Sequence, residues 1–106
     1  MRTIALVQDM FFRARITATA ETMNSKVDFA SSPYQIKEAD LIIVDLQKFG
    51  SESIVQLRQS NPTARIVGYL PHIDMDLKAS AQQAGFSQVF SKSEFTKKLP
   101  DLLKRG

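Results

Sequence analysis

The chain has 106 residues, of which 43% are hydrophobic and 24% are charged, and its net charge is +3. These values are ordinary for a globular protein and argue against disorder, so residues 1–106 are expected to form a single domain. The absence of cysteine excludes disulfides, thiolate metal sites and cysteine nucleophiles, and in so small a domain it favours the cytoplasm. No apolar run is long enough to predict a membrane span, and the N-terminus has no signal-peptide pattern.

The first half of the chain alternates short apolar runs with helical segments. The predicted elements are a strand over 3–7, a helix over 11–23 that its threonines weaken, and a weak strand over 27–30. Ser32-Pro33 opens a short helix or loop through residue 37, because proline suits the first helical turn. The run Leu-Ile-Ile-Val at 41–44 is the most apolar predicted strand.

The second half continues this alternation. Ser51 is the expected cap of a helix that ends at Asn61-Pro62, with Glu52 near the positive end of its dipole. The expected buried side of that helix is Ile54, Val55 and Leu57. The remaining elements are a strand over 66–70, a helix from a cap at Asp74 to a stop at Gly85, a strand over 89–90, and a last helix with Phe95, Leu99, Leu102 and Leu103 at helical spacing.

Strands that alternate with helices indicate a parallel sheet with helices on both faces. No internal repeat, linker or low-complexity segment interrupts the pattern. Pro100 falls inside the spacing of the last helix, so this helix is expected either to start late or to kink.

Charged side chains follow three of the predicted strands. Asp9, Asp45 and Lys92 stand after the first, third and fifth strands, and ligands of open parallel sheets bind beyond the carboxyl ends of the strands. Two nearby carboxylates repel each other, which Mg²⁺ can relieve, and a lysine ammonium suits a phosphoryl oxygen. Asp45 is therefore a candidate nucleophile toward phosphorus, with Mg²⁺ and Lys92 stabilising the charge on the transferred group.

This pattern resembles the receiver domain of bacterial response regulators over essentially the whole chain. The segments that carry the resemblance are ADLIIVDL at 39–46 and the Ala84-Gly85 pair, whose glycine lies seven residues before Lys92. The resemblance implies a CheY-like, flavodoxin-like α/β fold, with a doubly wound five-stranded parallel sheet in the order 2-1-3-4-5 between two layers of helices.

The resemblance also implies roles for individual residues. Asp45 matches the phosphoacceptor, Asp9 a direct Mg²⁺ ligand, and Lys92 the lysine that contacts the phosphoryl group. The backbone carbonyl of Gln47 matches a further metal ligand. The implied function is that of an atypical single-domain response regulator in two-component signalling or a phosphorelay, which is no enzyme beyond self-catalysed phosphoryl transfer to and from Asp45.

Four positions depart from the family pattern. Gln8 replaces the first acid of an acidic pair, and Leu70 stands at the switch hydroxyl position. Val89 stands at the switch aromatic position, while the aromatic Phe90 is one residue further and faces the other side of the sheet. Ser93 replaces the usual proline after the lysine. The loop that follows Asp45 also lacks the family's Met-Pro and looks shortened.

The resemblance further implies output through protein–protein contacts. The expected interaction face includes Phe95, Lys97 and Lys98, and the partners are a histidine kinase or another signalling protein, together with a second copy of the chain as a homodimer. No DNA-binding output domain is expected after the last helix, and no membrane contact is expected.

Other interpretations remain open. The domain could be a pseudo-receiver whose interactions ignore phosphorylation, or a small nucleic-acid-binding domain that uses the basic residues near the C-terminus. The basic residues of the nucleic-acid interpretation are Lys92, Lys97, Lys98, Lys104 and Arg105. A flavin or nucleotide site is disfavoured by the lack of a glycine-rich phosphate loop.

The candidate site residues also have structural interpretations. Asp9 could be only an N-cap, Asp45 only a turn cap, and Lys92 only an ion-pair partner of Asp45. The single histidine, His72, is expected to be exposed polar surface. Met10, Phe11 and Phe12 are either a patch that binds a partner or, at one position at least, part of the core.

Overall fold

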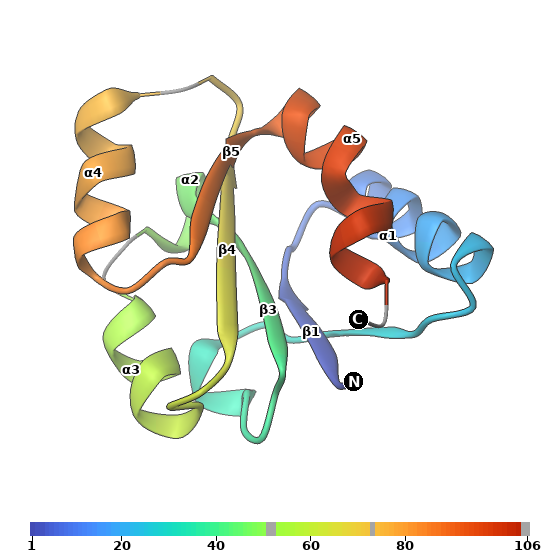
Figure 1. The fold of residues 1–106 in the computed structure, drawn as a ribbon, viewed down its shortest axis with the longest axis horizontal. Helices are drawn as coiled ribbons and strands as arrows, with labels where there is room; N and C mark the ends of the chain where they lie inside the picture. Colours follow the sequence, from blue (N-terminus) through green and yellow to red (C-terminus); the bar gives the residue numbers. More distant parts are fainter. Residues whose placement is uncertain (51–52, 73, 105–106) are drawn as a thin grey trace.

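The computed structural model describes residues 1–50, 53–72 and 74–104. At its centre lies one sheet of five parallel strands in the order β2-β1-β3-β4-β5 (Figure 1). The strands are β1 (Thr3–Leu6), β2 (Val27–Phe29), β3 (Leu41–Asp45), β4 (Arg65–Leu70) and β5 (Gln88–Ser91). The flavodoxin-like sheet predicted from the sequence is confirmed.

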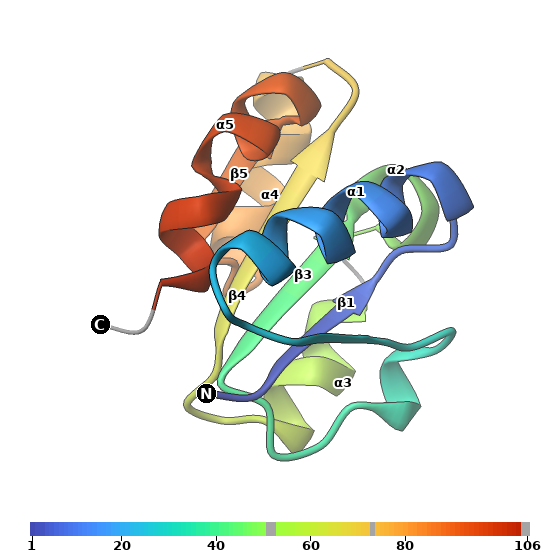
Figure 2. The same cartoon turned by 90° about the vertical axis from the view of Figure 1, so that its right-hand side faces the viewer.

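Helices cover both faces of the sheet. α1 (Met10–Thr22) and α5 (Lys92–Leu103) lie side by side on one face, and α3 (Ser53–Ser60) and α4 (Met75–Gln83) lie on the other (Figures 1 and 2). A 3₁₀ turn over Pro33–Gln35 occupies the segment expected to hold a short helix or loop. None of the helices within the described residues is long and apolar enough to cross a membrane.

The apolar run of β3 explains the position of Asp45. Leu41 and Ile43 belong to the core beneath α1 and α5, whereas Ile42 and Val44 belong to the core beneath α3 and α4. Successive side chains of a strand point to opposite faces, so a strand covered on both faces needs an apolar residue at every position. The run therefore ends at the rim of the sheet, where Asp45 is only partly buried.

Polar caps set the helix starts on either side of the sheet. Asp9 caps α1, Asp74 caps α4, and Ser91 forms a capping box with Glu94 at the start of α5. α4 stops at Gly85, whose φ of +109° lies in the region that favours glycine. The Asp74 cap and the Gly85 stop are confirmed, whereas the predicted cap at Ser51 and the adjacent Glu52 lie outside the described residues.

Three local predictions were wrong or incomplete. Val55 was expected to be buried but is 61% exposed, because only Ile54 and Leu57 of α3 face the sheet. α5 starts at Lys92 and continues through Pro100, so it does not start late. A further short helix, α2 (Leu46–Phe49), follows β3 directly and was not predicted.

Gly68 of β4 lets α2 sit against the sheet. A Cβ atom added at Gly68 would lie 2.7 Å from Cδ1 of Leu46, closer than side chains tolerate. Leu46 is 2% exposed and immediately follows Asp45. The absence of a side chain at Gly68 therefore helps to fix the turn that carries Asp45.

Asn61 joins the end of α3 to the segment before β3. Its side-chain NH₂ donates to the carbonyls of Ile36 and Leu57, both at 3.0 Å, and its side-chain oxygen accepts from the Ala39 N–H at 2.9 Å. The residue is 3% exposed, and its amide satisfies backbone groups that water cannot reach.

Candidate functional site

Asp45 is the last residue of β3 and the N-cap of α2. Its Oδ1 accepts a hydrogen bond of 3.1 Å from the Gln47 N–H, and the residue is partly buried. The expected capping role is thus real, but it uses a single hydrogen bond. A carboxylate can accept several, so Asp45 retains acceptor capacity toward the rim of the sheet.

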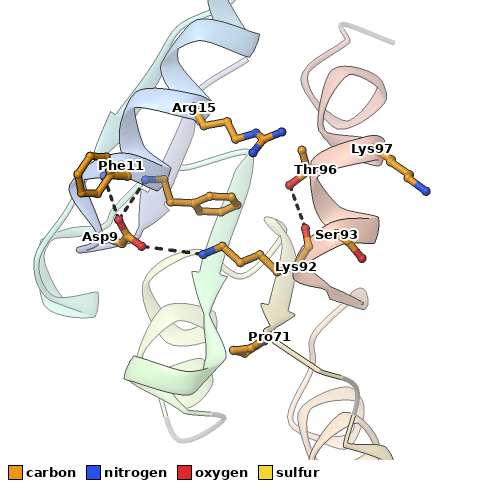
Figure 3. Close-up of a pocket in the computed structure, with 9 residues that line it drawn as sticks. Asp9, Phe11, Arg15, Pro71, Lys92, Ser93, Thr96 and Lys97 are labelled. Carbon is orange, nitrogen blue, oxygen red and sulfur yellow. Dashed lines mark hydrogen bonds and ion pairs between the residues drawn. The ribbon is translucent and has the colours of Figure 1, made fainter.

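Asp9 caps α1 with one carboxylate oxygen and faces Lys92 with the other. Oδ1 accepts from the N–H groups of Phe11 at 2.9 Å and Phe12 at 3.2 Å, while Oδ2 lies 3.9 Å from the Lys92 Nζ (Figure 3). The cap and the ion pair therefore occupy different oxygens of the same side chain.

Lys92 reaches Asp9 from the first position of α5, directly after β5. Its ammonium also lies 4.6 Å from the centre of the Phe12 ring, a cation–π contact. The side chains of Lys92 and Asp9 are 42% and 48% exposed, so their ion pair contributes little stability. The suggested ion pair between Lys92 and Asp45 was wrong, because among the described residues the partner of Lys92 is Asp9.

Tyr69 belongs to the same site and was missed by the sequence analysis. It pairs with Asp45 across β3 and β4, and its ring packs against Phe12 at 4.9 Å and Phe95 at 5.0 Å between ring centres. Burial raises the pKa of the Tyr69 phenol far above its usual value, and the Asp45 and Asp9 carboxylates raise it further. The sequence places Tyr69 at the end of a predicted strand, but only the register between β3 and β4 sets it opposite Asp45.

The acidic residues fit Mg²⁺ in donor type. Mg²⁺ takes one or two protein carboxylates and fills its shell with waters and phosphate oxygens. Asp9 lies beyond β1, and Asp45 ends the neighbouring strand β3. Within the described residues no three His, Cys, Asp or Glu side chains gather as a metal cluster. Gln47 lies inside α2, where carbonyls point away from the N-cap, so ligation by its carbonyl stays a prediction.

A pocket of about 630 Å³ opens beside Asp9 and Lys92, between the first turns of α1 and α5 (Figure 3). Cationic and hydroxyl side chains contribute much of its wall, and Figure 3 shows Arg15 reaching across from α1 toward Thr96 of α5. The lining residues are Asp9, Phe11, Phe12, Arg15, Pro71, Lys92, Ser93, Thr96 and Lys97.

Comparison with known proteins identifies the fold. No protein-family model and no curated protein matches the sequence. Among solved structures, a response regulator from Hahella chejuensis is 21% identical with a TM-score of 0.84, covering 96% of this chain and 91% of that one. The chain has the receiver-domain fold.

Two further solved structures share this fold. A response regulator from Burkholderia pseudomallei, with a phosphorylated aspartic acid, a calcium ion and citrate, is 17% identical with a TM-score of 0.79, covering 98% of this chain and 67% of that one. The beryllofluoride-activated NtrC4 receiver domain dimer is 16% identical with a TM-score of 0.77, covering 96% of this chain and 95% of that one. At these identities the likeness establishes the fold alone.

The departures from the receiver pattern have clear structural positions. Gln8 is exposed just beyond β1, and Ser93 is exposed in the first turn of α5. Leu70 is 4% exposed and packs in the core beneath α3 and α4 together with Val89. Phe90 packs in the opposite core, as the alternation of strand residues predicts. The fold therefore uses the Leu70 and Val89 positions for packing.

The predicted interaction face needs one correction. Phe95 is completely buried and stacks on Tyr69, so it cannot contact a partner, whereas Lys97 and Lys98 are exposed. The pattern Phe95, Leu99, Leu102 is the core-facing stripe of α5, which explains the error.

His72 is exposed, as predicted. The first three residues of α1 differ in burial, as expected. Phe12 is 5% exposed and belongs to the core, while Met10 and Phe11 are 71% and 91% exposed. Of the two exposed side chains, Phe11 lines the pocket.

Proposed function

We propose that this chain is an atypical receiver domain of two-component signalling in which Asp45 accepts a phosphoryl group. The observation that carries the proposal is the placement of Asp45 at the carboxyl edge of a receiver-fold sheet. At the same edge Asp9, beyond the neighbouring strand β1, pairs with Lys92, which follows the edge strand β5. Parallel sheets of this type bind ligands at that edge.

The proposed reaction is attack by an Asp45 carboxylate oxygen on the phosphorus of a phosphoryl donor. With acetyl phosphate as donor, the bond from phosphorus to the acetate oxygen breaks, acetate leaves with the electron pair, and Asp45 becomes an acyl phosphate. Such a transfer depends mainly on positioning and on neutralising the charge of the phosphoryl oxygens. Asp45 is held by its backbone contact to Gln47 and by the packing of Leu46 beneath it.

Lys92 would supply one positive charge to the transferred group. It must leave Asp9 to do so, and this exchange costs little because both side chains are about half exposed. When bound, Mg²⁺ held by the carboxylates of Asp9 and Asp45 would neutralise further charge on the phosphoryl oxygens.

The test is intact-mass measurement after incubation with acetyl phosphate and Mg²⁺. The wild-type chain is expected to gain the mass of one phosphoryl group, and the Asp45→Asn variant is expected to gain none. Asp74→Asn is the matched control, because Asp74 also caps a helix with its carboxylate and lies outside the candidate site. No gain in the wild type, or an equal gain in Asp45→Asn, would refute phosphorylation at Asp45.

A second candidate function is an interaction module whose contacts do not depend on phosphorylation. Two observations favour it: Leu70 and Val89, at the positions where the receiver pattern has a hydroxyl and an aromatic side chain, pack in the core, and Asp9 is already paired with Lys92. This candidate predicts that self-association, measured by sedimentation velocity, is the same with and without acetyl phosphate and Mg²⁺. The phosphoacceptor proposal predicts a shift that Asp45→Asn abolishes.

The proposed partners are signalling proteins, including a histidine kinase as phosphoryl donor, and a second copy of the chain. Support for self-association comes from the receiver fold that this chain shares with the dimeric NtrC4 receiver domain. Exposed Lys97 and Lys98 on α5 are the residues we assign to the contact face. A nucleic-acid role is less well supported, because Lys92 is engaged by Asp9 and Phe12.

A further inference from the structure

The side chain of Tyr69 packs in the core next to the candidate site. Directly paired residues of neighbouring strands project from the same face of the sheet, so Tyr69 and Asp45 project together toward α1 and α5. The Tyr69 ring is stacked on Phe95 with an interplanar angle of 23° and tilted against Phe12. These contacts hold the ring in one orientation.

The hydroxyl of Tyr69 is nevertheless free of internal partners among the described residues. No hydrogen bond joins it to another described group, although the residue is only 2% exposed. The hydroxyl of a buried tyrosine usually has a hydrogen-bond partner, so the Tyr69 hydroxyl is a donor that the described residues do not use.

The strand register places the Tyr69 side chain beside Asp45. The two residues are directly paired near the ends of β4 and β3 and project from the same face of the sheet. The Tyr69 ring also packs against Phe12, whose backbone N–H donates to Asp9. The phenol O–H is therefore a hydrogen-bond donor on the face of the sheet from which Asp45 projects.

We propose that the Tyr69 hydroxyl donates a hydrogen bond to an oxygen of a phosphoryl group carried by Asp45. This inference rests on the proposed function of Asp45. Leu70, at the position where the receiver pattern has a hydroxyl, points into the opposite core and cannot make such a bond. Tyr69 supplies the missing donor from the preceding strand position and from the other face of the sheet.

The test uses beryllofluoride with Mg²⁺ as the phosphoryl probe and compares two tyrosine variants. The chain has two tyrosines, and Tyr34 is 70% exposed in the 3₁₀ turn before β3, so Tyr34→Phe is the matched control for Tyr69→Phe. Each variant loses one hydroxyl and keeps its ring. Fluorine NMR gives the affinity for the probe in each protein.

Tyr69→Phe is expected to bind beryllofluoride roughly tenfold or more weakly than the wild type, as befits loss of a hydrogen bond to a charged group. Tyr34→Phe is expected to bind as the wild type does. Equal affinities of Tyr69→Phe and the wild type would overturn the role of Tyr69 and leave the proposed function intact. Absence of binding in the wild type and in Tyr34→Phe would overturn both.

A measurement on the unaltered chain guards against misfolding of the variant. With isotope-labelled tyrosine, NMR of the wild type gives one ring signal for Tyr69 and one for Tyr34. Addition of beryllofluoride and Mg²⁺ is expected to shift the Tyr69 signal and leave the Tyr34 signal in place. An unchanged Tyr69 signal under conditions in which the probe binds would overturn the proposal.

Discussion

Replacement of Asp9 by asparagine and by alanine separates its structural role from its role in the site. Asparagine caps helices as well as aspartate does, so Asp9→Asn keeps acceptors for the N–H groups of Phe11 and Phe12. It loses only the charge that faces Lys92 and the helix dipole. Since the ion pair is about half exposed, we expect a loss in the free energy of unfolding of about 1 kcal/mol or less.

Asp9→Ala removes the cap together with the charge. Loss of an N-cap costs about 1 kcal/mol, so the total for alanine is expected to be about 2 kcal/mol. Urea denaturation measures both values. Similar losses for the two variants would show that the hydrogen bonds to α1 do not stabilise the helix start, and would refute the reasoning about the cap.

The same two variants test the metal assignment. Mg²⁺ that binds the folded chain raises its free energy of unfolding, so the wild type is expected to gain stability with increasing Mg²⁺. Both Asp9 variants are expected to lose this gain, whereas Asp74→Asn, a cap of α4, is expected to keep it. A gain in Asp9→Asn equal to that of the wild type would exclude Asp9 as a ligand.

Two further predictions concern the frame of the site. Asn61→Ala removes the side-chain partner of the Ala39 N–H and of the Ile36 carbonyl, while the Leu57 carbonyl keeps the backbone N–H of residue 61. The substitution is expected to lower the free energy of unfolding by about 3 kcal/mol in urea denaturation, and a loss below about 1 kcal/mol would contradict this account. Ser91→Ala removes the capping box of α5 and is expected to cost about 1 kcal/mol near neutral pH. The side-chain hydrogen bond from Ser91 lowers the pKa of Glu94, so the part of the difference that depends on the Glu94 carboxylate is present above the ordinary glutamate pKa and is lost as the pH falls through the lowered one. The hydrogen bond that Ser91 Oγ accepts from the Glu94 N–H does not titrate. The difference in urea midpoint between Ser91→Ala and the wild type should therefore narrow in acid without vanishing, and a constant difference would contradict the assigned cause.

The sheet and the helix caps were predictable because local chemistry decides them. The run at 41–44 is apolar at every position and β-branched at three of them, as is typical of a strand covered on both faces, and Asp74 and Gly85 carry the usual start and stop signals of a helix. The receiver pattern then supplied the strand order, which short-range patterns do not contain.

The errors arose where contacts between residues distant in the sequence determine the local structure or the burial of a side chain. α2 is too short to show a helical period, and it depends on the space that Gly68 leaves for Leu46. The involvement of Tyr69 follows from its register opposite Asp45, which no single segment of the sequence reveals. Phe95 was assigned to the surface from its place in the family, although its own helical spacing indicated the core.

The site itself was predicted in outline but not in its pairing. Asp9 and Lys92 were expected at one edge and lie there, yet the ion pair joins these two residues and leaves Asp45 with a backbone contact. Which carboxylate pairs with Lys92 depends on how far the side chains extend from the first turns of α1 and α5. Sequence spacing gives the strand ends but not the direction in which a lysine extends from them.

The most direct test of this account is the mass of the chain after treatment with acetyl phosphate and Mg²⁺. The account predicts a gain of one phosphoryl group in the wild type and in Asp74→Asn, and no gain in Asp45→Asn. A wild-type chain that stays unmodified under these conditions would contradict the central claim that Asp45 is a phosphoacceptor.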